Sequence, residues 1–207
     1  MLDFTEYTKI FISLFAIIDP VGIIPIMIAF TAGMTAQRRE RVGRMASLSV
    51  LGILLAALLM GEPILEFFGI SIHSFRTAGG ILLLLMSITM LVGAKPAPDD
   101  IDGDGDATTS VAIVPLSTPL LAGPGAISTV ILDAHKASVP AHYAAMALIM
   151  VLLSLTVWLT FLVAPWISQR LGKPGISIFT RLMGLLLAAI AVEFIAGGLR
   201  GLFPALG

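Results

Sequence analysis

Two carboxylates inside apolar stretches of the chain, Asp19 and Glu193, are the side chains best suited to chemistry. Asp19 lies about twelve residues into its apolar segment, which is roughly 18 Å along a straight helix. An ionisable group at that depth in a membrane costs about 2.5 kcal/mol or more, so it is a functional candidate by default. Such a carboxylate can carry a proton, bind a cation or bind a substrate ammonium. Asp19 also precedes Pro20, a good arrangement for a helix N-cap, and the two roles can coexist.

Asp19 belongs to the first of two matching interruptions in the apolar sequence. The first, residues 18–25, holds two prolines and a glycine, and the second, residues 115–125, ends in Gly-Pro-Gly. Pro20 and Pro124 stand 104 positions apart in a chain of 207 residues. Proline lacks an N–H group and glycine relaxes the backbone, so each interruption predicts an unwound stretch between two half-helices. A matched pair indicates a transporter binding site, whereas the plainer interpretation is a pair of kinks used for packing.

The predicted site combines the backbone of both interruptions with the hydroxyl groups around the second. N–H groups at helix N-termini near Gly22 and Gly125 would bind a carboxylate. Asp19 or Glu193 would couple a proton or a sodium ion. The predicted substrate-binding residues are Asp19, Pro20, Gly22, Pro25, Ser117, Thr118, Gly123, Pro124, Gly125, Ser128 and Thr129.

No residue pattern predicts a metal site, a cofactor or an enzyme. The chain has no cysteine, and it lacks the His-x-x-x-His and Glu-x-x-His spacings of catalytic zinc. The acidic run at 99–106 begins like the calcium loop of an EF-hand, but Val111 stands where the bidentate acid belongs. A nucleophile motif of the type Gly-x-Ser-x-Gly is also missing.

The composition places the whole chain in a lipid bilayer. Hydrophobic residues make up 57% of the sequence and charged residues only 12%, with a mean hydropathy of +1.02. A soluble domain carries about 25% charged residues. The net charge of -1 argues against nucleic acid as a partner. The first residues lack the basic region and cleavage site of a signal peptide, so we expect the first apolar segment to be retained.

Six apolar segments predict an all-α membrane protein with six transmembrane helices. Each is near or above the roughly 20 residues that a helix needs to cross a bilayer. The segments are residues 7–32, 42–68, 75–94, 109–134, 141–168 and 176–203. We expect a first three-helix repeat over 1–95, an acidic flexible cytoplasmic loop over 96–108 and a second three-helix repeat over 109–207.

Matching residues recur at a nearly constant offset in the two halves. Arg76 and Arg181 are 105 positions apart, as are Gly79 and Gly184. Three spans per half is an odd number, so the second half must enter the membrane from the opposite side. The sequence therefore predicts a 3+3 inverted repeat in which helices 1 and 4 are broken.

The basic residues between spans predict the orientation. The densest basic cluster, at 38–44, follows the first span, and Arg170 and Lys173 lie between spans five and six. Loops rich in Lys and Arg stay in the cytoplasm. Because the spans alternate in direction, both termini are expected on the periplasmic or exterior side.

Two motifs resemble those of the MarC family, also called the six-span neutral amino acid transporter family. They are Asp-Pro-Val-Gly-Ile-Ile-Pro at 19–25 and Pro-Leu-Leu-Ala-Gly-Pro-Gly-Ala-Ile-Ser at 119–128. The resemblance covers the full length of the chain. In the family the first motif usually begins Asn-Pro, so Asp19 adds a charge or a titratable proton. The resemblance implies a multi-pass protein of the bacterial plasma (inner) membrane that transports small neutral amino acids such as glycine or alanine.

The leading prediction is a secondary transporter that holds its substrate between the broken helices 1 and 4. Its partners would be a small amino acid, H+ or Na+, and the lipid bilayer; a homo-oligomer is left open. The alternative is a non-transporting membrane scaffold or regulatory protein, in which both interruptions would be packed shut. A structure distinguishes the two through the space and the polar groups at the interruptions.

Overall fold

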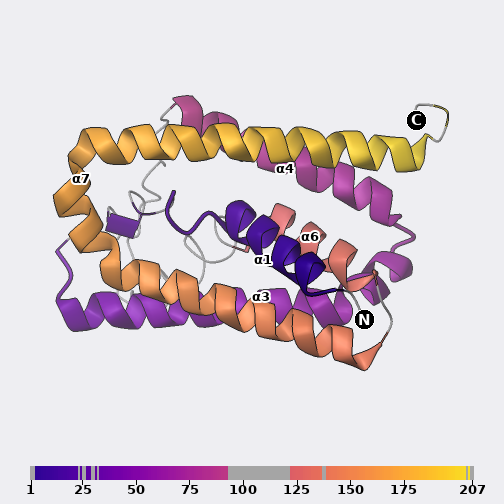
Figure 1. Ribbon diagram of the computed structural model, residues 1–207, viewed down its shortest axis with the longest axis horizontal. Coiled ribbons are helices and arrows are strands. Elements are labelled where there is room, and N and C mark those ends of the chain that lie inside the picture. The colour runs from indigo at the N-terminus through magenta and orange to yellow at the C-terminus, as the bar shows by residue number, and fades with distance from the viewer. Residues whose placement is uncertain are drawn as a thin grey trace.

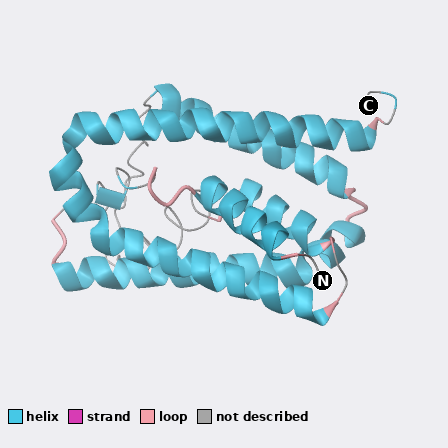
Figure 2. Cartoon of the chain, in the orientation of Figure 1, coloured by secondary structure: helices cyan, strands magenta, loops and turns pink. Residues whose placement is uncertain are grey.

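The computed structural model describes residues 3–22, 24, 27–28, 31, 33–92, 122–136, 139–203 and 205. Over these residues the chain is helical and contains no β-strand (Figure 2). The helices are α1 (Phe4–Ile18), α3 (Ala36–Phe67), α4 (Ile72–Val92), α6 (Pro124–Ala134) and α7 (Pro140–Leu202). The predicted acidic loop at 96–108 and the site residues Pro25, Ser117 and Thr118 lie outside the described residues.

Helix α7 consists of two helical parts joined by a sharp turn. Gly172 has φ 62° and ψ 178°, a conformation that a residue with a side chain rarely adopts. The chain reverses there, and the parts Pro140–Ile167 and Pro174–Leu202 lie in different layers of the molecule (Figure 1). The single element α7 therefore supplies two membrane spans.

Four helices are long and apolar enough to cross a membrane: Ala36–Phe67, Ile72–Val92, Pro140–Ile167 and Pro174–Leu202. They coincide with four of the six predicted segments, which confirms an all-α, multi-pass membrane protein. The other two predicted segments contain α1 and α6. With 15 and 11 residues, these helices reach about 22 and 16 Å, short of the roughly 30 Å hydrocarbon core.

The helices pack in three pairs. In Figure 1, α3 lies beside the first part of α7, α4 lies beside its second part, and the short helices α1 and α6 lie between these two layers. The Ser154 hydroxyl donates a hydrogen bond of 2.7 Å to the Ser47 carbonyl across the α3–α7 contact. Gly80 lets α4 approach the backbone of Ala191, the close contact that small residues allow in lipid.

Local sequence explains where several helices begin and end. Thr35 caps α3 by accepting a hydrogen bond of 3.3 Å from the Arg38 N–H. Pro124 and Pro140 occupy the first turns of α6 and α7, where the missing N–H costs nothing. The turn after α3 uses Gly69 at φ 65°, so the chain enters α4 within a few residues.

The loops gather at two ends of the molecule. At one end lie both termini and the turns between α3 and α4 and between α6 and α7 (Figure 1). We call this the termini end. At the other, the basic end, α3 begins with its arginines at 38–44 and α7 turns at Gly172. The two basic loops that were predicted to be cytoplasmic thus lie at the same end.

Candidate substrate site and polar clusters

The first interruption begins directly after α1, at Asp19. This residue adopts the left-handed conformation, φ 43° and ψ 61°, and its N–H group bonds to the Phe15 carbonyl at 3.0 Å. Its side chain turns back and accepts a hydrogen bond of 3.0 Å from the Gly22 N–H through Oδ1. Asp19 is thus the C-cap of α1, and its side chain closes a turn over residues 20–22, whereas the sequence suggested the N-cap of a helix that begins at Pro20. Asp19 is only 2% exposed, and its second oxygen, Oδ2, has no hydrogen-bond partner among the described residues.

Gly22 is required by the position of the Asp19 carboxylate. A Cβ atom built on Gly22 would overlap that carboxylate. Pro20 is buried beside it, and the Ile24 N–H bonds to the Val21 carbonyl at 3.1 Å. The described part of the first interruption is thus a compact turn that holds one carboxylate in the protein interior.

The second interruption ends at the N-terminus of α6. Gly123 is the N-cap, with φ −66° and ψ 174°, and Pro124 is the first helical residue. Because glycine has no side chain, Gly123 cannot cap the first N–H groups of α6. Gly125 is buried, and a Cβ atom there would overlap the side chain of Leu83 on α4. The start of α6 therefore combines a partial positive charge with a tight apolar wall.

Ser128 and Thr129 lie one turn into α6, and both are buried. The Thr129 hydroxyl donates to the Gly125 carbonyl at 2.8 Å. The Ser128 hydroxyl is completely buried and has no hydrogen-bond partner among the described residues. It faces Gly79 of α4, where a Cβ atom would overlap it.

An unpartnered, buried polar atom costs about 1–3 kcal/mol, so such atoms mark positions where a ligand would help. The described residues contain four of them: Asp19 Oδ2, Arg76 Nε, Ser128 Oγ and Trp158 Nε1. Two of the four are predicted site residues, one from each interruption. They belong to regions that lie next to each other, since α1 contacts α6.

Glu193, the second predicted coupling carboxylate, lies on an exposed face of α7. Its neighbour Phe194 points inward, where the Arg76 guanidinium carbon lies 5.4 Å from its ring centre. The structure therefore separates the two predicted coupling groups, with Asp19 in the interior and Glu193 on the outside.

A cavity of about 230 Å³ opens near the basic end. The chain that follows the first interruption forms one wall of it, and α3 and α7 form the others. Its lining residues are Met27, Ile28, Thr31, Arg39, Phe161, Ala164, Pro165 and Gln169. Pro165 has no N–H group for the Phe161 carbonyl, which leaves an extra acceptor at this wall. The sequence contained no signal for this cavity, because its walls come from three distant segments.

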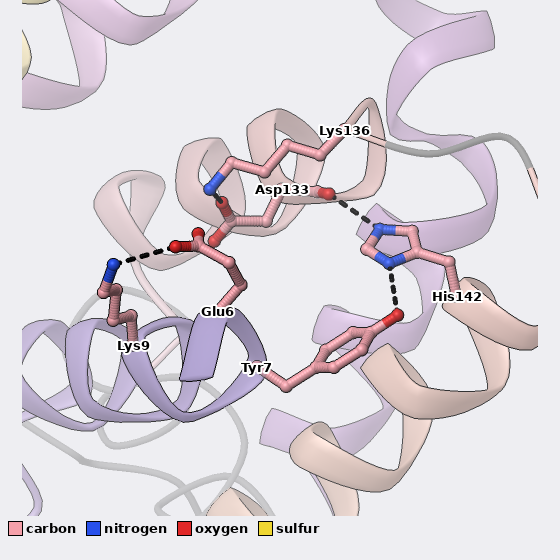
Figure 3. Close-up of polar contacts among 6 residues, drawn as sticks. All are labelled: Glu6, Tyr7, Lys9, Asp133, Lys136 and His142. Carbon is pink, nitrogen blue, oxygen red and sulfur yellow. Dashed lines mark hydrogen bonds and ion pairs between the residues drawn. The ribbon is translucent and has the colours of Figure 1, made fainter. Parts of the chain in front are cut away.

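A second polar cluster lies at the termini end, where α1, α6 and α7 meet (Figure 3). The ring of His142 hydrogen-bonds the Tyr7 hydroxyl through Nδ1 at 3.0 Å and the Asp133 carbonyl through Nε2 at 2.9 Å. Lys136 pairs with the Asp133 carboxylate at 2.8 Å, and Lys9 pairs with Glu6 at 2.8 Å. Sequence reasoning missed His142, because a polar residue just inside a span gives no sign of burial.

In the part of the chain that the structure describes, no group of three or more His, Asp or Glu residues could hold a metal ion. Among the described residues, the polar groups at the two interruptions are the Asp19 carboxylate, the Ser128 and Thr129 hydroxyls and backbone N–H groups.

The fold and these interruptions define a polytopic α-helical membrane protein with two short helices between its layers of long helices. The chain belongs to the MarC family of integral membrane proteins, whose family model matches residues 4–203.

Similar proteins occur in bacteria and archaea. The UPF0056 membrane protein YhcE of Escherichia coli is 42% identical over 99% of this chain and 96% of its own length. MJ1677 of Methanocaldococcus jannaschii is 40% identical over 97% of this chain and 98% of its own, and YvbG of Bacillus subtilis is 37% identical over 98% of each. Their names state that they are membrane proteins and give no substrate. No solved structure matches the chain significantly.

Proposed function

We propose that this protein is a secondary transporter for small neutral amino acids of the glycine and alanine type. The observation that carries the proposal is a pair of buried polar atoms, Asp19 Oδ2 and Ser128 Oγ, one at each interruption, that have no hydrogen-bond partner among the described residues. A scaffold has no use for such a pair, because packing the interruptions shut would favour partnered or apolar groups.

The chemistry of the two interruptions matches the two ends of an amino acid. The free Asp19 oxygen accepts hydrogen bonds from the substrate ammonium. The first N–H groups of α6 and the Ser128 hydroxyl donate to the substrate carboxylate. Leu83 packs directly against Gly125, so a substrate with a large side chain would not fit beside it.

The pairing of the helices supports a 3+3 inverted repeat of six spans. Segments predicted to be equivalent lie side by side: α1 with α6, α3 with the first part of α7, and α4 with its second part. Ser47 and Ser154, which hydrogen-bond across one pair, are 107 positions apart, close to the repeat offset. A pseudo-two-fold axis that relates two halves of a chain can bring equivalent helices into contact in such pairs.

The proposal also covers coupling and orientation. Asp19 is the coupling group for a proton or a sodium ion, since it is the buried member of the two predicted carboxylates. The basic end faces the cytoplasm of a bacterial plasma membrane, and both termini face the exterior. The cavity lined by Thr31 and Arg39 then gives access from the cytoplasmic side.

Uptake by proteoliposomes tests the proposal. Purified protein should accumulate labelled glycine or alanine, and a screen with and without sodium at two pH values identifies the coupling ion. Asp19→Asn keeps the shape but removes the charge, so uptake should fall to the background level. Gly125→Leu, whose side chain would overlap Leu83 at the start of α6, should have the same effect.

Asp3→Asn is the matched control, because Asp3 is exposed at the start of α1 and makes no side-chain cap. It should transport like the unmodified protein. Unchanged uptake in both Asp19→Asn and Gly125→Leu would show that the site lies elsewhere.

A further inference from the structure

His142 is a completely buried imidazole that joins three helices. It lies near the start of α7 and is 0% exposed. Its two ring nitrogens reach Tyr7 on α1 and the backbone of Asp133 at the end of α6 (Figure 3). The short helices α1 and α6 are therefore tied to α7 through a single ring.

The hydrogen bonds of this ring determine its tautomer. The Asp133 carbonyl can only accept, so Nε2 must carry a hydrogen and donate it. In the neutral ring Nδ1 is then the acceptor, and the Tyr7 hydroxyl donates to it.

The same geometry also accommodates the protonated ring. A hydroxyl can accept as well as donate, so Nδ1–H of an imidazolium would donate to the Tyr7 oxygen at the same position. The Asp133 carbonyl keeps its hydrogen bond in both states. The ring can thus bind a proton and keep both hydrogen bonds. A partner at Nδ1 that could only donate or only accept would not allow this.

Charged groups of both signs surround His142. The Asp133 carboxylate interacts electrostatically with both His142 and Arg76, and it pairs with Lys136. Glu6 and Lys9 of α1 form a second ion pair nearby. The charged or titratable groups near the ring are Glu6, Tyr7, Lys9, Arg76, Asp133, Lys136 and Tyr143.

We propose that His142 is a proton-binding site of this protein, which links protonation to the packing of α1 and α6 against α7 at the termini end. The site is separate from the substrate site, because Tyr7 precedes Asp19 by about twelve residues, or roughly 18 Å along α1. Its role in coupling rests on the proposed transport function: a proton from the termini side would bias the two short helices that hold the substrate.

Nitrogen NMR of the histidine rings tests the proposal directly. The chain has only three histidines, His73, His135 and His142. In purified protein with labelled histidine, the His142 ring should be a neutral Nε2–H tautomer at high pH. It should become doubly protonated, reversibly, when the pH is lowered.

The two exposed histidines provide the assignment. His73→Gln and His135→Gln each remove one signal without touching the core, and the remaining signal belongs to His142. A His142 ring that stays neutral over the whole range in which the protein is folded would overturn the proposal and leave the residue a structural link.

Tyr7→Phe gives a second measurement. It removes the side-chain partner that the described residues supply to Nδ1, so the titration midpoint of the ring should change. An unchanged midpoint would contradict the role of Tyr7.

Uptake assays distinguish the proposed role of His142 from that of the substrate site. His142→Gln keeps a donor and an acceptor but cannot bind the proton, so uptake should persist with a flattened pH dependence. Asp19→Asn should abolish uptake at every pH. If the unmodified protein transports no amino acid, the transport proposal fails, and the NMR titration still decides whether His142 binds a proton.

Discussion

Each of the two interruptions places a helix terminus in the protein interior, but the polar groups at the two differ. At the first, α1 ends and the Asp19 side chain closes the turn, which leaves one buried carboxylate oxygen with no partner among the described residues. At the second, α6 begins at Pro124 without a side-chain cap, and the buried Ser128 hydroxyl likewise has no partner in the described part of the chain. The first interruption therefore offers negative charge, and the second offers neutral donors. This difference is the reason for proposing a substrate that carries both an ammonium and a carboxylate group.

The largest effect is expected at the first interruption, from Gly22→Ala. The added methyl group would overlap the Asp19 carboxylate, so either the turn or the carboxylate must move. We expect uptake to fall to background and the free energy of unfolding to drop by about 1–3 kcal/mol, as for other overpacked sites. Uptake assays and thermal unfolding of the purified variant measure the two quantities.

Gly52→Ala is the control for this variant, because a Cβ atom at the exposed Gly52 meets no neighbour within 4 Å. It should keep full uptake. If Gly22→Ala transports as well as Gly52→Ala does, the position of the Asp19 carboxylate has no bearing on the substrate.

A smaller effect is expected at the second interruption, from Ser128→Ala. Because the hydroxyl has no partner among the described residues, its removal should leave the thermal stability unchanged or slightly higher. The substrate should lose one hydrogen bond, so its Kd should rise about tenfold, equivalent to about 1.4 kcal/mol. Ser87→Ala, which removes a buried hydroxyl that bonds to the Leu84 carbonyl, should leave the Kd unchanged. A loss of stability without a loss of affinity in Ser128→Ala would assign the hydroxyl to packing.

The smallest effect is expected outside both interruptions, from Glu193→Gln. This carboxylate lies on an exposed face of α7, away from the interior where Asp19 lies. Uptake should change less than about twofold, within the range of surface substitutions remote from a site. If Glu193→Gln reduced uptake as much as Asp19→Asn does, Glu193 would be a coupling group.

The interruptions could be predicted from the sequence because their causes are local. Proline and glycine act on the backbone where they stand. The end of α1 and the start of α6 therefore follow directly from Pro20 and Pro124. Which glycines lie at helix contacts could not be predicted in this way: Gly80 lies against the backbone of Ala191, whereas a Cβ atom at Gly52 would meet no described neighbour within 4 Å.

The rest of the site depends on contacts between distant segments. The position of Glu193 along its span was readable, but the face on which it lies was not. Two residues turn a helix by about 200°, so Glu193 lies almost opposite the buried Ala191. Likewise, Tyr7 and His142 are 135 positions apart, and only the packing of α1 against α7 brings them together.

Cysteine reactivity at position 128 tests most directly that the interruptions form a substrate site. The chain has no cysteine, so Ser128→Cys introduces a single thiol in place of the free hydroxyl. A small, membrane-permeant thiol reagent should modify it, and glycine or alanine should slow the reaction in a saturable manner. Ser87→Cys, an equally buried position in α4, should stay unreactive. A thiol at 128 that never reacts, or that reacts at a rate the substrate does not change, would contradict the account.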